Sequence, residues 1–414
     1  MGFHMRAVVP AVLLAVSAGV VSAQHNAKAQ WTGTWAAAPC SAEERKAMHV
    51  HDQTLRLIVH TSIGGTAARI RLSNTFGKDA LTITSAHLAL RDTGSTLKPG
   101  TDRALTFSGR PGITIPAGAS VLSDAVDETV PALSDVAVSL YLANDVAVTT
   151  HHPSALQTSY LGAGDQTAQP QFTQTRTLTN WPFLTELDVT AAQPQKAVVT
   201  LGSSTTDGAH STVDTNSRWP DFLARHLQAQ PALRQIGVLN EGIGGNRVLH
   251  DGAGGNGPAF GPSASSRFDR DVLAVAGVKY LVLFEGGNDI NHPGESAPLS
   301  EAVSAEDIIA GYRQIIQQAH THGIRVLLGT ITPYAGVGKP ETYAQREAKR
   351  IAVNRWIMSQ HESDAAVDFS SAIADPAHPN AIATQYDSGD HLHPNDAGYK
   401  TLADKVDLAF FRSR

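Results

Sequence analysis

The pattern of apolar residues changes near residue 195, and this change limits the folds open to the chain. After it, short apolar runs alternate with segments of helical period. In residues 305–323, AEDIIAGYRQIIQQAHTHG, apolar side chains recur every three or four positions and form one apolar face. Apolar strands separated by helices are typical of a parallel sheet covered on both faces. The sequence therefore predicts a three-layer, doubly wound α/β domain over residues 195–414.

Residues 31–190 show a different pattern, of many short strands. Residues 68–72, Ala-Arg-Ile-Arg-Leu, alternate apolar and charged side chains, and clusters of Gly, Pro, Asp and Asn separate this run from its neighbours. No long stretch here holds a helical period. The pattern predicts an all-β sandwich domain that precedes the α/β domain.

The first residues have the features of a secretory signal peptide. Arg6 precedes an apolar run that ends in Val-Ser-Ala at Ala23, before a polar segment. The run contains Pro10 and is short for a membrane span, although an uncleaved anchor is the alternative. We expect residues 1–23 to be removed after Ala23. The mature protein would then be secreted, extracellular or periplasmic, with no membrane attachment.

Composition excludes several classes of function. The net charge is −6 and only 17% of the 414 residues are charged, so no basic surface for nucleic acid is expected. Cys40 is the single cysteine, which rules out a disulfide within the chain and a thiolate metal cluster.

Polar residues follow the first three predicted strands of the α/β domain. Ser203 and Ser204 follow the first, the segment 240–246, NEGIGGN, follows the second, and Asn288 follows the third. Doubly wound sheets bind their ligands at the carboxyl ends of strands, so these residues should share one edge. Near the C-terminus, the segment 390–394, DHLHP, adds an acid and two histidines.

These residue types are the parts of an acyl-transfer site. A serine hydroxyl needs a base within hydrogen-bond reach, and His393 can serve. Asp390, three residues earlier, can hold the imidazole in one tautomer and offset its charge. The oxyanion of the tetrahedral intermediate needs several preorganised donors. The N–H groups of Ser204 and Gly245 and the side-chain amide of Asn288 are the candidates.

The order Ser204, Gly245, Asn288, then Asp390-x-x-His393-Pro resembles the SGNH/GDSL hydrolase family over about residues 195–412. The resemblance implies a serine esterase with Ser204 as nucleophile and a flavodoxin-like sheet. Two neighbouring glycines, Gly242 and Gly244, compete with Gly245 for the oxyanion role. The chain departs from the family at Ser203, where the family's Gly-Asp-Ser motif has aspartate.

Other site chemistries have less support. The nucleophile elbow Gly-x-Ser-x-Gly of α/β-hydrolases does not occur, nor does the phosphate-binding motif GxxxxGK[ST]. Asp390, His391 and His393 are reasonable zinc ligands, but no HExxH motif accompanies them. We therefore predict no metal and no cofactor.

The substrate is inferred from the resemblance and from export. Secreted family members with an N-terminal β domain are similar to carbohydrate-ester deacetylases and arylesterases associated with xylan breakdown, which favours acetyl esters on plant polysaccharide. Lipid or aryl esters are the close alternative, and a catalytically silent carbohydrate-binding protein is a third. Trp31, Trp35, Trp181 and the histidines 151 and 152 either meet substrate or pack within and between the domains, and packing is favoured.

Overall fold

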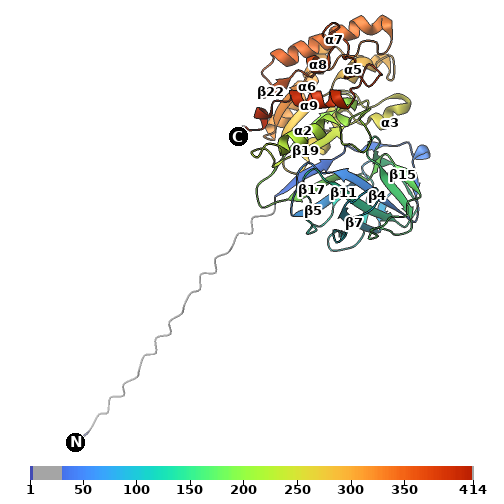
Figure 1. Cartoon of the computed structure of the whole chain (residues 1–414), viewed down its shortest axis with the longest axis vertical. Helices are drawn as coiled ribbons and strands as arrows, with labels where there is room; N and C mark the ends of the chain where they lie inside the picture. Colours follow the sequence, from blue (N-terminus) through green and yellow to red (C-terminus); the bar gives the residue numbers. More distant parts are fainter. Residues whose placement is uncertain (3–29, 413–414) are drawn as a thin grey trace.

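The computed structural model describes residues 1–2 and 30–412. The expected cleavage site after Ala23, and almost all of the expected signal peptide, lie outside the described residues. Figure 1 shows a β-rich part, blue to green, packed against a mixed α/β part, green to red. Among the described residues, no helix is both long enough and apolar enough to cross a membrane.

The N-terminal part contains two main antiparallel sheets that share one apolar core. Ala68, Ile70 and Leu72 face that core. Arg69 and Arg71, which alternate with them, point to the opposite face and pair with Asp188 and Glu186. The predicted all-β domain is therefore present. The first sheet comprises β1 (Trp31–Ala36), β17 (Leu184–Thr190), β5 (Ala67–Ser73) and β10 (Ser120–Leu122), in that order. The second comprises β15 (Arg176–Leu178), β14 (Ser159–Ala163), β4 (Gln53–His60), β11 (Asp135–Leu142), β7 (Ser85–Leu90) and β8 (Arg103–Ala104).

Smaller sheets of two or three strands complete this part. They are β16 (Trp181–Pro182), β13 (Thr150–His152) and β2 (Cys40–Ser41) in one sheet, β12 (Val146–Ala147) with β3 (His49–Val50), and β6 (Leu81–Ile83) with β9 (Ile113–Ile115). Trp35 and Trp181 are buried and meet edge to face, with ring centroids 4.9 Å apart. Trp35 and Trp181 are therefore packing residues, the alternative that the sequence analysis favoured over contact with substrate.

The C-terminal part contains the predicted parallel sheet. Its five strands run in the order β19-β18-β20-β21-β22. They are β18 (Lys196–Gly202), β19 (Ile236–Gly242), β20 (Val278–Phe284), β21 (Arg325–Gly329) and β22 (Ala365–Val367). The order matches the flavodoxin-like 2-1-3-4-5 arrangement, in which ligands bind where the strand order reverses. That point is the carboxyl end of β18, immediately before Ser203.

Helices cover both faces of this sheet. One apolar core joins the sheet to α6 and α7, and another joins it to α2, α8 and α9. The predicted helix at 305–323 is α6, and it begins with a capping box between Ser304 and Asp307. The helices are α1 (Ser204–Asp207), α2 (Trp219–Gln228), α3 (Gly257–Phe260), α4 (Ala264–Phe268), α5 (Gly287–Asn291), α6 (Ala305–Thr321), α7 (Pro340–Ser359), α8 (Phe369–Ile373) and α9 (Asp396–Lys405).

The β part lies against β19, the edge strand of the parallel sheet. Two glycines allow this close approach, because a Cβ added to Gly237 would lie 2.4 Å from the carbonyl oxygen of Gly33. The N–H of Val238 donates to the Ser62 hydroxyl at 2.9 Å. An edge strand that would otherwise present unpaired backbone groups is therefore covered.

Candidate active site

Three strand ends meet at one edge of the parallel sheet, as expected. Gly202, the last residue of β18, is in register with Gly242 of β19 and with Phe284 of β20. Ser204 begins α1 directly after β18, and Asn288 lies in α5 directly after β20. The register therefore brings the segments that carry the predicted residues to the same side of the sheet.

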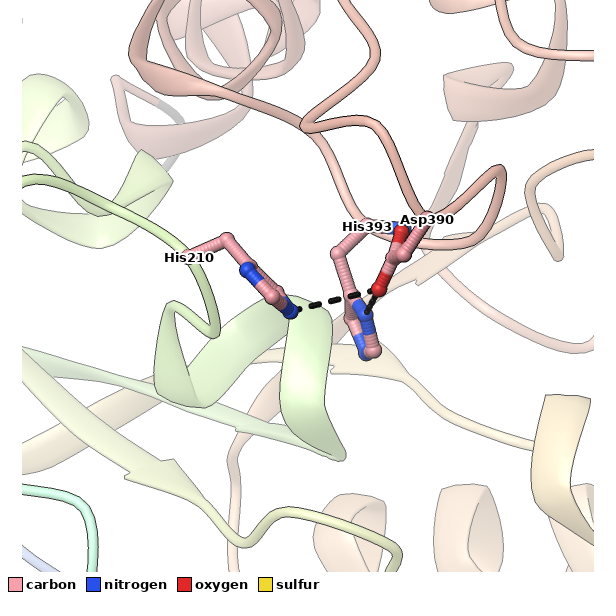
Figure 2. Close-up of side chains that lie close together, drawn as sticks. All are labelled: His210, Asp390 and His393. Atoms are coloured by element: carbon pink, nitrogen blue, oxygen red, sulfur yellow. Dashed lines mark hydrogen bonds and ion pairs between the residues drawn. The ribbon is translucent and has the colours of Figure 1, made fainter.

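A hydrogen-bonded chain links Ser204 to His393 and Asp390. The Ser204 Oγ lies 2.8 Å from His393 Nε2, and His393 Nδ1 lies 2.5 Å from Asp390 Oδ2. Because a carboxylate can only accept, Nδ1 carries the ring proton and Nε2 is free to accept from the serine hydroxyl. Asp390 and His393 lie in the loop before α9 (Figure 2).

Asp390 is held as a carboxylate by its neighbours. Partial burial acts to raise its pKa, but hydrogen bonds from the His393 ring and from the backbone N–H groups of His393 and Leu392 outweigh burial. The pKa of Asp390 is therefore held well below its ordinary value. Asp390 is therefore a carboxylate at neutral pH.

The predicted oxyanion donors have hydrogen atoms to offer. Within the described residues, the N–H groups of Ser204 and Gly245 donate to no protein acceptor. One amide hydrogen of Asn288 Nδ2 is used by the carbonyl oxygen of Asn246 at 2.9 Å, which fixes the side chain and leaves the second hydrogen unused among these residues.

The two competing glycines already donate to protein acceptors. Gly242 N–H binds Asn240 Oδ1 at 2.9 Å, and Gly244 N–H binds Asp207 Oδ2 at 3.1 Å. Gly245 has φ +77, and a Cβ there would lie 2.2 Å from the Phe260 ring, so this position requires glycine. Hydrogen bonding thus distinguishes Gly245 from Gly242 and Gly244, the three glycines that the sequence left as candidates for the oxyanion role.

Arg267 joins the segments of the site, and no motif in the sequence pointed to it. It is fully buried in α4, and its guanidinium donates to the carbonyl oxygens of Gly202 at 3.2 Å and Glu241 at 2.7 Å. It also donates to Asn246 Oδ1 at 3.1 Å. One cation therefore fixes the ends of β18 and β19 relative to each other.

Asp207 joins α1, the helix that begins with Ser204, to the β part. Its Oδ1 lies 3.0 Å from His152 Nε2, and its Oδ2 accepts from Gly244. His152 Nδ1 lies 2.8 Å from the carbonyl oxygen of Ala38, so Nδ1 must donate there. Both residues are almost fully buried. His152 is thus buried between the β part and α1.

Asp289, next to Asn288, supports the backbone. Its two oxygens accept from Val248 N–H at 2.8 Å and Leu249 N–H at 3.0 Å. Burial raises the pKa of Asp289 to about 6, and these two hydrogen bonds oppose that rise.

Ser203 lies near a buried carboxyl group. Burial raises the pKa of Glu285 well above its ordinary value, while the Arg267 charge and the Ser203 hydroxyl act in the opposite direction. Neither Glu285 oxygen makes a hydrogen bond of regular geometry within the described residues. At position 203, where the family has an aspartate, this chain has a serine. Its hydroxyl lies beside the carboxyl group of Glu285, the residue that follows β20.

The structure does not bring together the alternative ligand set of Asp390, His391 and His393. The His391 ring instead binds Asp387, with Nδ1 and Oδ2 2.7 Å apart. His210 lies beside Asp390 and His393 in its place, from the loop after α1 (Figure 2).

Part of the chain is similar to known proteins. Residues 200–401 match the model of the GDSL-like Lipase/Acylhydrolase family. No curated protein sequence matches the chain. Solved structures with similarity include a GDSL-like lipase from Bacteroides thetaiotaomicron VPI-5482, 20% identical over 53% of this chain and 92% of that chain, with a TM-score of 0.38. Another is an acetylxylan esterase from Geobacillus stearothermophilus, 19% identical over 53% of this chain and 95% of that chain, with a TM-score of 0.39.

The family match spans the segments that carry Ser204, Gly245, Asn288 and the Asp390–His393 pair. The C-terminal part of this chain therefore belongs to the GDSL-like lipase and acylhydrolase family, and the chain is a carboxylic ester hydrolase.

Proposed function

We propose that the chain cleaves esters through an acyl-enzyme on Ser204. The hydrogen-bonded chain from Asp390 through His393 to Ser204 carries this proposal. His393 Nε2 takes the hydroxyl proton as Ser204 Oγ attacks the acyl carbon, and then returns it to the leaving alcohol. Water, deprotonated by the same nitrogen, attacks the acyl-enzyme and releases the acid.

The other residues stabilise charge in this scheme. Asp390 fixes the His393 tautomer and offsets the imidazolium charge. The N–H groups of Ser204 and Gly245 and the amide of Asn288 bind the oxyanion, and each such donor contributes about 3 kcal/mol to lowering the barrier. A silent carbohydrate-binding protein would not need these donors and the hydrogen-bonded triad together.

The substrates in this proposal are short acyl esters, with acetyl groups on plant polysaccharide first. The family resemblance and the expected export are the grounds for placing acetyl esters first. Lipid or aryl esters are the second candidate. Export follows from the sequence of residues 1–23, and a secreted form that begins at Gln24, read by mass spectrometry, would support it.

The nucleophile is tested by Ser204→Ala, with Ser203→Ala as the matched control. We expect Ser204→Ala to lower kcat for p-nitrophenyl acetate roughly 10⁴-fold or more. It should also abolish covalent labelling by an organophosphonate. Ser203→Ala should keep most activity and the label. The reverse result would refute Ser204 as nucleophile.

The substrate class is tested by comparing kcat/KM across a panel. The panel contains acetylated xylan, p-nitrophenyl esters of increasing chain length and acylglycerols. The proposal expects the highest values for acetyl esters and a steep fall with acyl length. A maximum at long chains would favour the lipid alternative.

A further inference from the structure

His210 is a second imidazole in contact with the triad carboxylate, and the proposed mechanism does not use it. Its Nε2 lies 3.2 Å from Asp390 Oδ2, and its ring centroid lies 5.3 Å from that of His393. Figure 2 shows both imidazoles directed at the same oxygen of the Asp390 carboxylate. The His210 side chain is 52% exposed, so solutes can reach it.

The backbone holds His210 in this place. Its φ is +66, a left-handed conformation that is uncommon outside glycine. On one side, the carbonyl oxygen of Ala209 accepts from the Tyr399 hydroxyl at 2.6 Å. On the other, Thr212 N–H donates to Asp396 Oδ1 at 2.8 Å. Both partners lie in α9, the helix that follows the Asp390–His393 loop, so one element fixes the positions of all three side chains.

We propose that His210, Asp390 and His393 form an inhibitory site for Zn²⁺. Two imidazoles and a carboxylate are ligand types that zinc prefers, and their ligand atoms all lie within 4.8 Å of one another. Two ligands of one tetrahedral zinc ion lie about 3.4 Å apart, given zinc–ligand distances near 2.1 Å.

The geometry is close to that requirement. The separation between His210 Nε2 and Asp390 Oδ2, 3.2 Å, already fits a shared ion. The 2.5 Å separation between His393 Nδ1 and Asp390 Oδ2 must lengthen by about 1 Å for both to bind it. The Asp390 side chain is one-third exposed. Its Oδ1 accepts from the N–H groups of Leu392 and His393, so Oδ2 must move away from the His393 ring by rotating about that held oxygen.

Inhibition, unlike zinc binding itself, rests on the proposed function. An ion bound to His393 Nδ1 takes the place of the proton that Nδ1 donates to Asp390, and that proton leaves to solvent. Solvent returns one proton to the other ring nitrogen, Nε2, so the ring stays neutral and no net proton is released. In that tautomer Nε2 donates to Ser204 Oγ and cannot accept the hydroxyl proton. The bound ion therefore removes the general base without moving the nucleophile.

Binding is tested on the inactive Ser204→Ala protein, which keeps all three ligands. Untagged protein is titrated with zinc chloride by calorimetry. We expect one site per chain, weakened by at least about tenfold when His210→Gln is added, the scale typical of lost support at a metal site. The control is His226→Gln, because His226 Nε2 also lies 3.2 Å from a carboxylate, that of Asp404, away from the triad. Equal affinity with and without His210 would overturn the proposal, as would loss of binding in His391→Gln instead.

Inhibition is measured as the ratio of p-nitrophenyl acetate hydrolysis with and without zinc chloride, within each variant. Zinc should inhibit the unmodified enzyme and the His226→Gln variant at about the same concentration, and chelation should reverse it. The His210→Gln variant should need at least about tenfold more zinc. An active enzyme that zinc does not inhibit would overturn the inference. Zinc binding to a protein without esterase activity would refute the proposed function alone.

Discussion

At the scale of single residues, hydrogen bonds distinguish neighbours that look alike in the sequence. Gly244 and Gly245 are adjacent, but only Gly244 donates to an acceptor in the described part of the chain. The two glycines also differ in the space around them. A Cβ on Gly244 would have Asp207 Oδ2 as its nearest neighbour, at 3.7 Å, whereas one on Gly245 would collide with Phe260.

This difference leads to a prediction for two substitutions. Gly245→Ala should displace the loop, because φ +77 and the Phe260 ring both disfavour a side chain there. If the Gly245 N–H binds the oxyanion, kcat should fall about 10²-fold or more while KM changes little. Gly244→Ala should stay within about fivefold of the unmodified enzyme. Equal losses in steady-state kinetics with p-nitrophenyl acetate would contradict this assignment.

Residue order and residue chemistry were enough to predict Ser204, His393 and Asp390 as one site, and the structure brings them together. The catalytic roles of these residues remain predictions. His210 and Arg267 had no comparable signal. Each acts through side-chain contacts with residues far away in the chain, and such contacts leave no local pattern in a single sequence.

At the scale of secondary-structure elements, α1 is held by more than the sheet behind it. Asp207, its last residue, connects it to β13 through His152 and to the loop after β19 through Gly244. Arg218 adds a hydrogen bond to the carbonyl oxygen of Asp207 at 2.8 Å. A short helix of one turn has little stability of its own, so these contacts decide where Ser204 lies.

We predict that His152 positions the nucleophile from the β part. Its Nδ1 donates to the carbonyl oxygen of Ala38 and its Nε2 lies 3.0 Å from the Asp207 carboxylate, so each ring nitrogen has an oxygen partner. Glutamine can replace only one of these two contacts well. His152→Gln should therefore lower kcat about tenfold with little change in KM, because an interaction that shapes the site has been lost.

The control for this prediction is His151→Gln on the same strand. His151 Nδ1 lies 3.1 Å from Asn180 Nδ2, within the β part, and burial lowers the pKa of His151 to about 4, so it is neutral. This variant should keep its kcat. Affinity for a boronic acid that mimics the tetrahedral intermediate should fall in His152→Gln in parallel with kcat. A loss of thermal stability alone, with normal kcat, would make His152 a purely structural residue.

The sequence predicted these elements better than their junctions. Apolar period and strand length identified α6 and the parallel strands, because burial of one or both faces repeats along each element. The role of β13 could not be read in this way. His152 and Asp207 lie 55 residues apart and belong to different parts of the fold.

At the scale of the whole molecule, the β part covers an edge that the parallel sheet would otherwise expose. Ser62 accepts from the N–H of Val238 in β19, and Glu186 accepts from Ala276 N–H at 3.0 Å. Ala36 of β1 belongs to the same apolar core as the parallel sheet. The two parts therefore share stabilising contacts.

We predict that a chain starting at Ala191 will be less stable than the full chain. Removing the β part exposes the β19 edge and the apolar surface under β1, which favours association between chains. A loss of several kcal/mol corresponds to a melting temperature lower by roughly 10 °C in a domain of this size. Circular dichroism and size-exclusion chromatography measure both effects. As a milder comparison, Ser62→Ala in the full chain removes only the hydroxyl that accepts from Val238 N–H. It should lower the free energy of unfolding by about 1 kcal/mol. A truncated chain with unchanged melting temperature and activity would show that the β part is dispensable.

The sequence by itself determined the two kinds of architecture, the order of the site segments and the chemical class of the site. It could do so because periodicity, strand ends and residue types are local properties of the chain. Only the tertiary structure decided which glycine has an N–H to offer, that Glu285 lies beside Ser203, that His152 contacts Asp207 of α1, and that His210 lies next to Asp390. These four facts depend on which distant side chains share a hydrogen bond or a space, and folding alone brings such side chains together.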